Sequence, residues 1–138
     1  MPNHWLLKTE PSTYSFQQLQ KDGRTVWDGV RNNLALMHLR TMMPGDRRLI
    51  YHTGAEKAVV GLARMIRGPY PDPKQNALKL VVVELEAEKP LPKPVTLAAI
   101  KAEPALEGLA LVRMPRLSVM PVTPALWKVV LGMGGMKE

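Results

Sequence analysis

The six residues Trp27–Asn32 read Trp-Asp-Gly-Val-Arg-Asn and combine an indole, a carboxylate, a guanidinium and an amide. Gly29 favours a tight backbone turn, on which these side chains can converge instead of alternating along a strand. An aromatic plane beside hydrogen-bonding groups suits a flat polar ligand such as a nucleobase. The alternative is an ordinary turn in which Trp27 is a core residue and Asp28 caps a backbone amide. The segment alone favours neither interpretation.

Asp28, Arg31 and His52 also allow a hydrolytic interpretation. His52 ends a predicted strand just before a glycine, where an imidazole can act as a general base if a partner orients it. Sequence separation does not show whether Asp28 lies near His52, and a strand-end histidine with a local hydrogen bond explains it equally well. The chain has no Gly-x-Ser-x-Gly motif of a serine nucleophile. A nucleic-acid-processing hydrolase therefore stays as an alternative function.

Metal and cofactor chemistry has little support in the chain. Cysteine is absent, and the three histidines are not spaced as metal pairs. The glycine-rich stretch 132–135 follows a predicted helix, whereas a phosphate-binding loop links a strand to a helix. We expect no metal and no cofactor.

Composition indicates one folded domain over residues 1–138, with 46% hydrophobic residues to build a core. No apolar stretch approaches the ~20 residues of a membrane span, and the N-terminus lacks the pattern of a signal peptide. We expect a cytoplasmic monomer that does not enter membranes. The net charge is +7, and residues 1–69 carry ten basic and five acidic groups. Such an excess attracts phosphate backbones without sequence discrimination.

The pattern of apolar residues, caps and breakers predicts short strands and helices in mixed order. The expected strands cover 5–8, 48–52, 58–63, 78–85, 109–112 and 117–119, and the expected helices cover 15–21, 32–43, 96–101 and 123–132. The stretch 68–73 reads as a long turn, and the prolines at 90, 92 and 94 read as a rigid loop. Gly61 inside a strand predicts a bulge or a close backbone approach. This order does not repeat as βαβ, so we expect an α+β fold with a small mixed or antiparallel β-barrel and peripheral short helices.

Six segments of the chain, in this order, resemble EVE domain proteins, which include the thymocyte nuclear protein family. They lie at Trp5–Pro11, Trp27–Asn32, Pro44–Asp46, Tyr51–Thr53, Val60–Ala63 and Arg116–Val119. The resemblance extends over roughly residues 4–131. It implies a PUA-like fold related to the YTH domains, which read methylated adenine in RNA. It also implies a non-catalytic reader of modified bases, mostly modified cytosines in DNA, with RNA ligands also considered.

The resemblance further implies the residues of a base-binding pocket. Trp27 and Val30 form it, Arg31, Asn32, Thr53 and Ser118 supply polar contacts, Tyr51 and His52 line the wall, and Lys8, Glu10 and Arg116 form the rim. The partner would be a modified base in DNA or RNA. Besides the hydrolase, an RNA- or protein-binding accessory module with a vestigial pocket is the remaining alternative.

Overall fold

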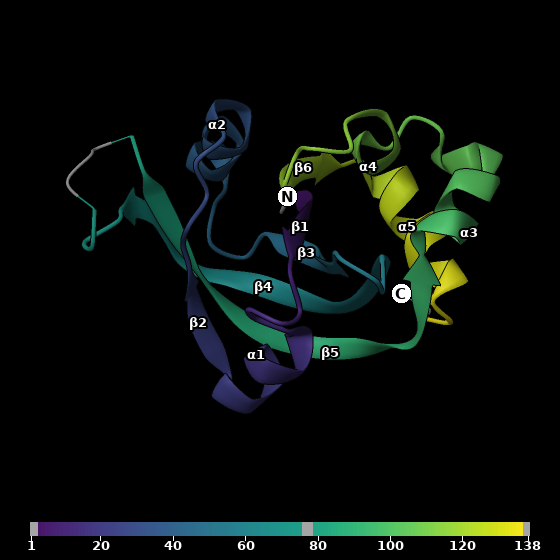
Figure 1. Ribbon diagram of the computed structural model, residues 1–138, viewed down its shortest axis with the longest axis horizontal. Coiled ribbons are helices and arrows are strands. Elements are labelled where there is room, and N and C mark those ends of the chain that lie inside the picture. The colour runs from purple at the N-terminus through teal and green to yellow at the C-terminus, as the bar shows by residue number, and fades with distance from the viewer. Residues whose placement is uncertain (1–2, 76–78, 137–138) are drawn as a thin grey trace.

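A single six-stranded sheet, strongly twisted and curled, organises the chain in the computed structural model, which describes residues 3–75 and 79–136 (Figure 1). Its strands are β1 (His4–Thr9), β2 (Arg24–Trp27), β3 (Arg47–His52), β4 (Ala58–Pro71), β5 (Val81–Thr96) and β6 (Val119–Val122). Their order across the sheet is β2-β5-β4-β3-β1-β6. The β1–β3 pair is parallel and the other pairs are antiparallel. Among the described residues no ladder joins the edge strands β2 and β6, so the expected barrel is an open one, within the expected α+β class.

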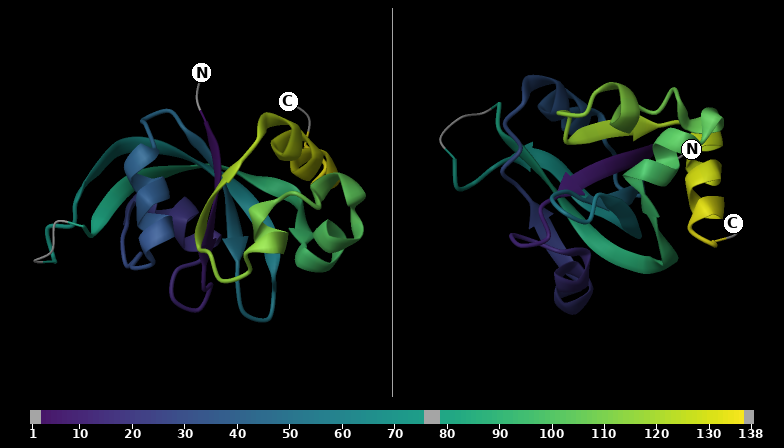
Figure 2. Two further views of the ribbon diagram at one scale, coloured as in Figure 1. Left: turned by 90° about the horizontal axis from the view of Figure 1, so that it is seen from above. Right: turned by 45° about the vertical axis from the view of Figure 1, so that its right-hand side comes forward.

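Short helices surround the sheet. They are α1 (Phe16–Asp22), α2 (Asn33–Thr41), α3 (Leu97–Ala102), the 3-10 turn η1 (Pro104–Leu106), α4 (Ala110–Arg113) and α5 (Pro124–Met133). In both views α3, α4 and α5 gather at one end of the molecule, and the β4–β5 hairpin projects at the opposite end (Figure 2). The described helices include none that is long and apolar enough to cross a membrane.

Capping residues start these helices where the sequence predicts. The side chains of Ser15, Asn32, Thr96 and Thr123 each accept a hydrogen bond from the backbone N–H three residues later. Gly23 then ends α1 with φ +79°, a conformation that favours glycine. The four predicted helices are therefore confirmed, with ends that differ by one or two residues.

The long hairpin corrects two expectations. β4 continues through the supposed turn at 68–73 as far as Pro71, and Tyr70 pairs with Val82. β5 continues through the three prolines to Thr96, where a rigid loop was expected. The reason is that β2 pairs only with residues 83–86 of β5. Beyond them β5 is an edge strand on that side, where a proline removes no ladder hydrogen bond.

Two further local predictions were wrong. A strand was expected at 109–112, but residues 110–113 form the one-turn helix α4, because four apolar residues do not by themselves distinguish a strand from a helix. The strand β2 was missed, since its four residues carry no clear alternation of apolar and polar side chains. This strand matters for function, because Trp27 is its last residue and lines the cavity of the candidate site.

The close approach predicted at Gly61 is confirmed. A Cβ placed there would come within 2.3 Å of Cζ of Phe16, the first residue of α1. The β3–β4 register also shifts beside Gly61, between Ile50 and Tyr51, as expected for a bulge. Gly61 thus allows α1 to pack its aromatic ring directly onto the strand, which holds the N-terminal part of the chain against the sheet.

Candidate functional site

The segment Trp27–Asn32 connects an edge strand to a helix. Trp27 is the last residue of β2 and pairs with Val83 of β5, whereas the side chain of Asn32 caps α2 by accepting from Ala35 N at 3.0 Å. Between them Gly29 has φ +78°. An added Cβ there would meet nothing within 4 Å, so the backbone conformation and not the space calls for glycine.

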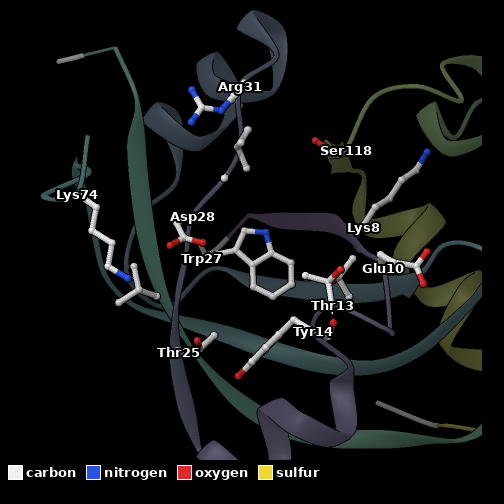
Figure 3. A pocket seen from close by; sticks show the side chains of 14 residues that line it. Lys8, Glu10, Thr13, Tyr14, Thr25, Trp27, Asp28, Arg31, Lys74 and Ser118 are labelled. Atoms are coloured by element: carbon white, nitrogen blue, oxygen red, sulfur yellow. Dashed lines mark hydrogen bonds between the residues drawn. The ribbon is translucent and has the colours of Figure 1, made fainter. Parts of the chain in front are cut away.

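A cavity of about 680 Å³ opens beside this segment (Figure 3). Its volume lies within the range of about 300–1,000 Å³ typical of small-molecule sites. The lining residues come from β1 and the loop after it, from β2 and the loop after it, from the β4–β5 connection and from the segment before β6. They are Lys8, Thr9, Glu10, Thr13, Tyr14, Thr25, Val26, Trp27, Asp28, Gly29, Val30, Arg31, Lys74 and Ser118.

The Trp27 indole stands at the centre of this cavity in Figure 3. Only 8% of the residue is exposed, and the ring of Tyr14 packs against it edge-on, with centroids 6.3 Å apart and planes at 85°. In the same view the indole nitrogen lies on the ring edge turned toward Arg31 and Ser118. A ring held in this way offers a fixed apolar surface and an N–H donor at low entropic cost.

Tyr14 is in turn anchored from both ends. Its backbone carbonyl accepts from Thr9 Oγ1 at 2.6 Å, and its hydroxyl donates to Asp22 Oδ2 at 2.7 Å. Burial is the main reason why the pKa of Tyr14 is raised. These contacts keep Tyr14 a neutral aromatic support for Trp27.

The rim of the cavity carries three cations, Lys8, Arg31 and Lys74, against the carboxylates Glu10 and Asp28. Lys8 Nζ donates to the carbonyl of Pro115 at 2.6 Å, and burial lowers the pKa of this lysine. The backbone and hydroxyl of Ser12 both donate to Glu10, which lowers the pKa of its carboxyl. The mouth therefore has a modest positive excess with polar groups of both signs.

Six of the sequence-predicted site residues line this cavity together: Lys8, Glu10, Trp27, Val30, Arg31 and Ser118. Sequence reasoning missed Tyr14, Thr25 and Lys74. Tyr14 lies in the loop before α1, Thr25 in the unrecognised strand β2, and Lys74 in the connection after β4. Only the scarcity of aromatic residues could have drawn attention to Tyr14, and nothing local distinguishes the other two.

His52 does not lie on the cavity wall, which corrects the expected placement. Only 1% of it is exposed. Its Nε2 accepts the backbone N–H of Phe16 at 2.9 Å, and its Nδ1 lies 2.7 Å from Glu56 Oε1. Nε2 therefore helps to hold the start of α1 against β3, and Nδ1 contacts the loop between β3 and β4. The structure does not bring His52 together with Asp28 and Arg31.

The other four predicted residues also lie outside the lining of this cavity. Asn32 caps α2, and Arg116 is exposed in the segment before β6. Tyr51 and Thr53 line a second, smaller hollow next to the first. Tyr51 and His52 lie on β3, which pairs with β1 in the sheet and contributes no residue to the lining of this cavity.

The described residues contain no group of three or more histidine, cysteine, aspartate or glutamate side chains arranged to hold a metal ion. What the cavity offers is an aromatic surface, hydroxyls and a mixed charged rim. This arrangement is suited to holding a planar polar group attached to an anionic chain.

The chain is also similar to several known proteins. The family model described as EVE domain matches residues 3–133. Thymocyte nuclear protein 1 of Homo sapiens is 27% identical over 167 aligned residues, which cover 96% of this chain and 74% of the human protein. A protein of Rhodopseudomonas palustris, solved by NMR, superposes with a TM-score of 0.94 at 48% identity and covers 99% of this chain and 95% of its own.

A second solved structure is that of human THYN1 protein in complex with 5-methylcytosine-containing DNA. It superposes with a TM-score of 0.88 at 25% identity, with 99% of each chain covered. These neighbours confirm the α+β, PUA-like fold that the sequence predicts.

Proposed function

Since the chain belongs to the EVE domain family, we propose that it binds nucleic acid and takes one modified base, in the first place a modified cytosine of DNA, into the cavity beside Trp27. The observation that carries this proposal is the Trp27 ring itself, which lines a cavity of about 680 Å³ with a polar, net positive rim. The human THYN1 complex with 5-methylcytosine DNA supports the choice of ligand.

The proposed mechanism is recognition of a base turned out of its stack. Unstacking costs a few kcal/mol, and less in single-stranded nucleic acid. Contact with Trp27 returns about 1–3 kcal/mol, as is typical of a base against an aromatic side chain. The exposed cations Arg31 and Lys74 attract the flanking phosphates. A single methyl group in the pocket contributes about 1–3 kcal/mol, so selectivity between modified and unmodified cytosine is modest.

The hydrolase alternative is less well supported. Asp28 and Arg31 line the cavity, but His52 is buried behind α1 with both ring nitrogens engaged. A general base must come within hydrogen-bond reach of the reacting proton. The proposed function is therefore binding without catalysis, and RNA is the competing ligand to be tested beside DNA.

Substitution of Trp27 tests the proposal. We expect Trp27→Ala to weaken binding of an oligonucleotide with one 5-methylcytosine by about 5- to 150-fold, which corresponds to the ~1–3 kcal/mol of a lost aromatic contact. Trp27→Phe keeps an aromatic plane and should retain part of that affinity. Fluorescence anisotropy with labelled modified and unmodified DNA and RNA measures the effect.

Met37→Ala provides the matched control, because Met37 is 49% exposed on α2 and does not line the cavity. Circular dichroism and thermal melting establish that each variant is folded. A folded Trp27→Ala protein with the affinity and the modification preference of the wild type would refute the proposed site. Equal affinity for every modified and unmodified DNA and RNA probe would favour the accessory-module alternative.

A further inference from the structure

A second hollow, of about 190 Å³, shares Lys8 with the cavity beside Trp27. It lies where β1, the loop after β3 and the helices α3 and α4 meet. Its lining residues are Lys8, Tyr51, Thr53, Gly54, Lys57, Leu97, Leu111 and Pro115. The volume is below the range of about 300–1,000 Å³ of most small-molecule sites, but it exceeds the ~30 Å³ share of one water several times. It suits a small polar group rather than a second base.

The cations of this hollow lack acidic partners. No carboxylate of the described residues forms an ion pair with Lys8 or Lys57. Lys8 Nζ is held instead by the Pro115 carbonyl at 2.6 Å and lies 5.8 Å from the centroid of the Tyr51 ring. A partly desolvated ammonium group without a counterion interacts strongly with an anion that reaches it.

Hydroxyl groups complete the donor set. Only 3% of Tyr51 is exposed. Its hydroxyl makes no hydrogen bond to any described residue. Burial raises the pKa of Tyr51, so the hydroxyl remains a proton donor. Thr53 Oγ1 lies at the side of the hollow, where it donates to Glu10 Oε2 at 3.2 Å. Two lysines and a tyrosine thus line the same small space.

The backbone conformation at Lys57 is also unusual for a lysine. Lys57 has φ +48°, and no other non-glycine residue in the described part of the chain has a positive φ. A lysine in this left-handed region costs about 1 kcal/mol relative to glycine, and asparagine tolerates it better. The position is fixed by the Lys57 carbonyl, which accepts from Leu97 N at 2.7 Å. Lysine thus stands at a position where the backbone favours glycine or asparagine, which directs attention to its side chain.

We propose that this second hollow binds a backbone phosphate of the nucleotide next to the base held beside Trp27, with Lys57 and Lys8 as the charged contacts and Tyr51 as a hydrogen-bond donor. The proposal rests on the proposed function, because the shared Lys8 makes the two hollows neighbouring subsites for one strand. Glu10 lies between the two hollows: it lines the cavity beside Trp27, and its carboxylate accepts from Ser12 and from Thr53 of the second hollow.

Two variants isolate the charge of Lys57 from its backbone. Lys57→Asn removes the charge and suits a positive φ, and Lys57→Arg retains the charge. Lys101→Gln is the matched control, since Lys101 is exposed on α3 and lines neither hollow. Dissociation constants are measured at several salt concentrations for DNA with one 5-methylcytosine and for its unmodified counterpart.

We expect Lys57→Asn to lower the steepness of log K against log salt by about 0.7–0.9, the value of one lost phosphate contact. The modified-to-unmodified affinity ratio should be unchanged, because a phosphate contact carries no base information. Lys57→Arg and Lys101→Gln should keep the wild-type slope. An unchanged slope in Lys57→Asn would overturn the proposal.

Replacing single phosphates around the modified base by neutral methylphosphonates locates the contact. One position should weaken wild-type binding more than it weakens binding by Lys57→Asn, as expected when both changes remove part of the same interaction. A uniform effect at all positions would reveal only long-range attraction and would overturn the site. Competition by inorganic phosphate at constant ionic strength, with no response to any methylphosphonate, would overturn the nucleic-acid assignment in favour of a free phosphate.

Base binding beside Trp27 and phosphate binding in the second hollow can be refuted independently. If Trp27→Ala leaves the preference for modified DNA intact while Lys57→Asn reduces the effect of one methylphosphonate, the reader function is wrong and the phosphate subsite stands. If Trp27→Ala removes the preference for modified DNA, and Lys57→Asn changes neither the salt slope nor any methylphosphonate effect, the reader function stands and the phosphate subsite is wrong.

Discussion

Trp27 combines two properties that the sequence left as alternatives. It is nearly buried, at 8% exposure, and it also lines the cavity. Tyr14 supports one edge of the ring, and β2 fixes its backbone against β5. A ring that is packed on one side and accessible on the other loses little freedom when a ligand arrives, which favours binding.

His52 illustrates the opposite outcome at the scale of a residue. Its position at a strand end, before a polar loop, made it a candidate for the pocket wall and for a catalytic base. The structure uses it to accept the N–H of Phe16 at the start of α1. A backbone donor at that point is one of the unsatisfied groups of a helix N-terminus, and His52 satisfies it from a distant strand.

We therefore predict that His52→Ala reduces stability and leaves ligand binding intact. The buried N–H of Phe16 loses its acceptor, which costs about 1–3 kcal/mol. Urea denaturation of both proteins measures the free energy of unfolding. Anisotropy with modified DNA, at a temperature where the variant is folded, should show the wild-type affinity. A variant with full stability that no longer binds would place His52 in the functional site after all.

At the scale of elements, the site depends on how α1 and β4 fit together. The Phe16 ring packs onto Gly61, so α1 and the loop before it, which carries Thr13 and Tyr14, stay close to the sheet. The fit leaves no room for a side chain on the strand. The bulges that accompany it let the long β4–β5 hairpin curl, which brings Lys74 back toward Trp27.

Two glycine substitutions with opposite expected effects on the free energy of unfolding test this fit. Gly61→Ala should destabilise the protein by about 1–3 kcal/mol, because the new Cβ overlaps the Phe16 ring and the core must shift. Gly132→Ala, on α5, should stabilise it by up to about 1 kcal/mol, because open space surrounds the new methyl group and alanine favours the helix.

Thermal melting of the two variants beside the wild type gives the comparison. If Gly61→Ala melts at the wild-type temperature, α1 is not packed on the strand as described. If both variants lose stability equally, the effect is one of glycine replacement in general and not of the contact with Phe16.

At the scale of the whole molecule, the net charge of +7 comes mostly from the first half of the chain. Residues 1–69 carry ten basic and five acidic groups, and residues 70–138 carry nine and seven. The first half supplies β1, β2 and the loop after β2, which line the cavity beside Trp27. Basic side chains at the cavity include Lys8, Arg31 and Lys74. A basic surface around a recognition pocket speeds encounter with an anionic polymer and holds it in place.

The proposed function therefore predicts a marked salt dependence. If the three cations of the cavity rim each neutralise one phosphate, log K should fall against log salt with a slope of about −2 to −3, at ~0.7–0.9 per contact. Titrations of modified DNA at four or more salt concentrations measure it. A slope near zero would mean that phosphate contacts contribute nothing, and the ligand would then be a free base or nucleoside.

Local sequence determined where the helices begin and where the backbone requires glycine. Caps at Ser15, Asn32, Thr96 and Thr123 start their helices because the bonded groups are only three residues apart, and such signals survive in any context. The turn at Gly29 and the close approach at Gly61 are equally local, since each follows from the absence of a side chain. The segments that resemble EVE domains also identified the family in advance.

Only the tertiary structure decided which side chains share a cavity. Lys8, Trp27 and Ser118 are far apart in the chain and meet because β1, β2 and the segment before β6 converge around one curled sheet. The prolines of β5 became part of a strand because the neighbouring strand β2 is short. His52 contacts the start of α1 because the fold places Phe16, 36 residues away in the chain, against its ring. Strand pairing between distant segments sets these outcomes, and no window of neighbouring residues contains the partners that determine them.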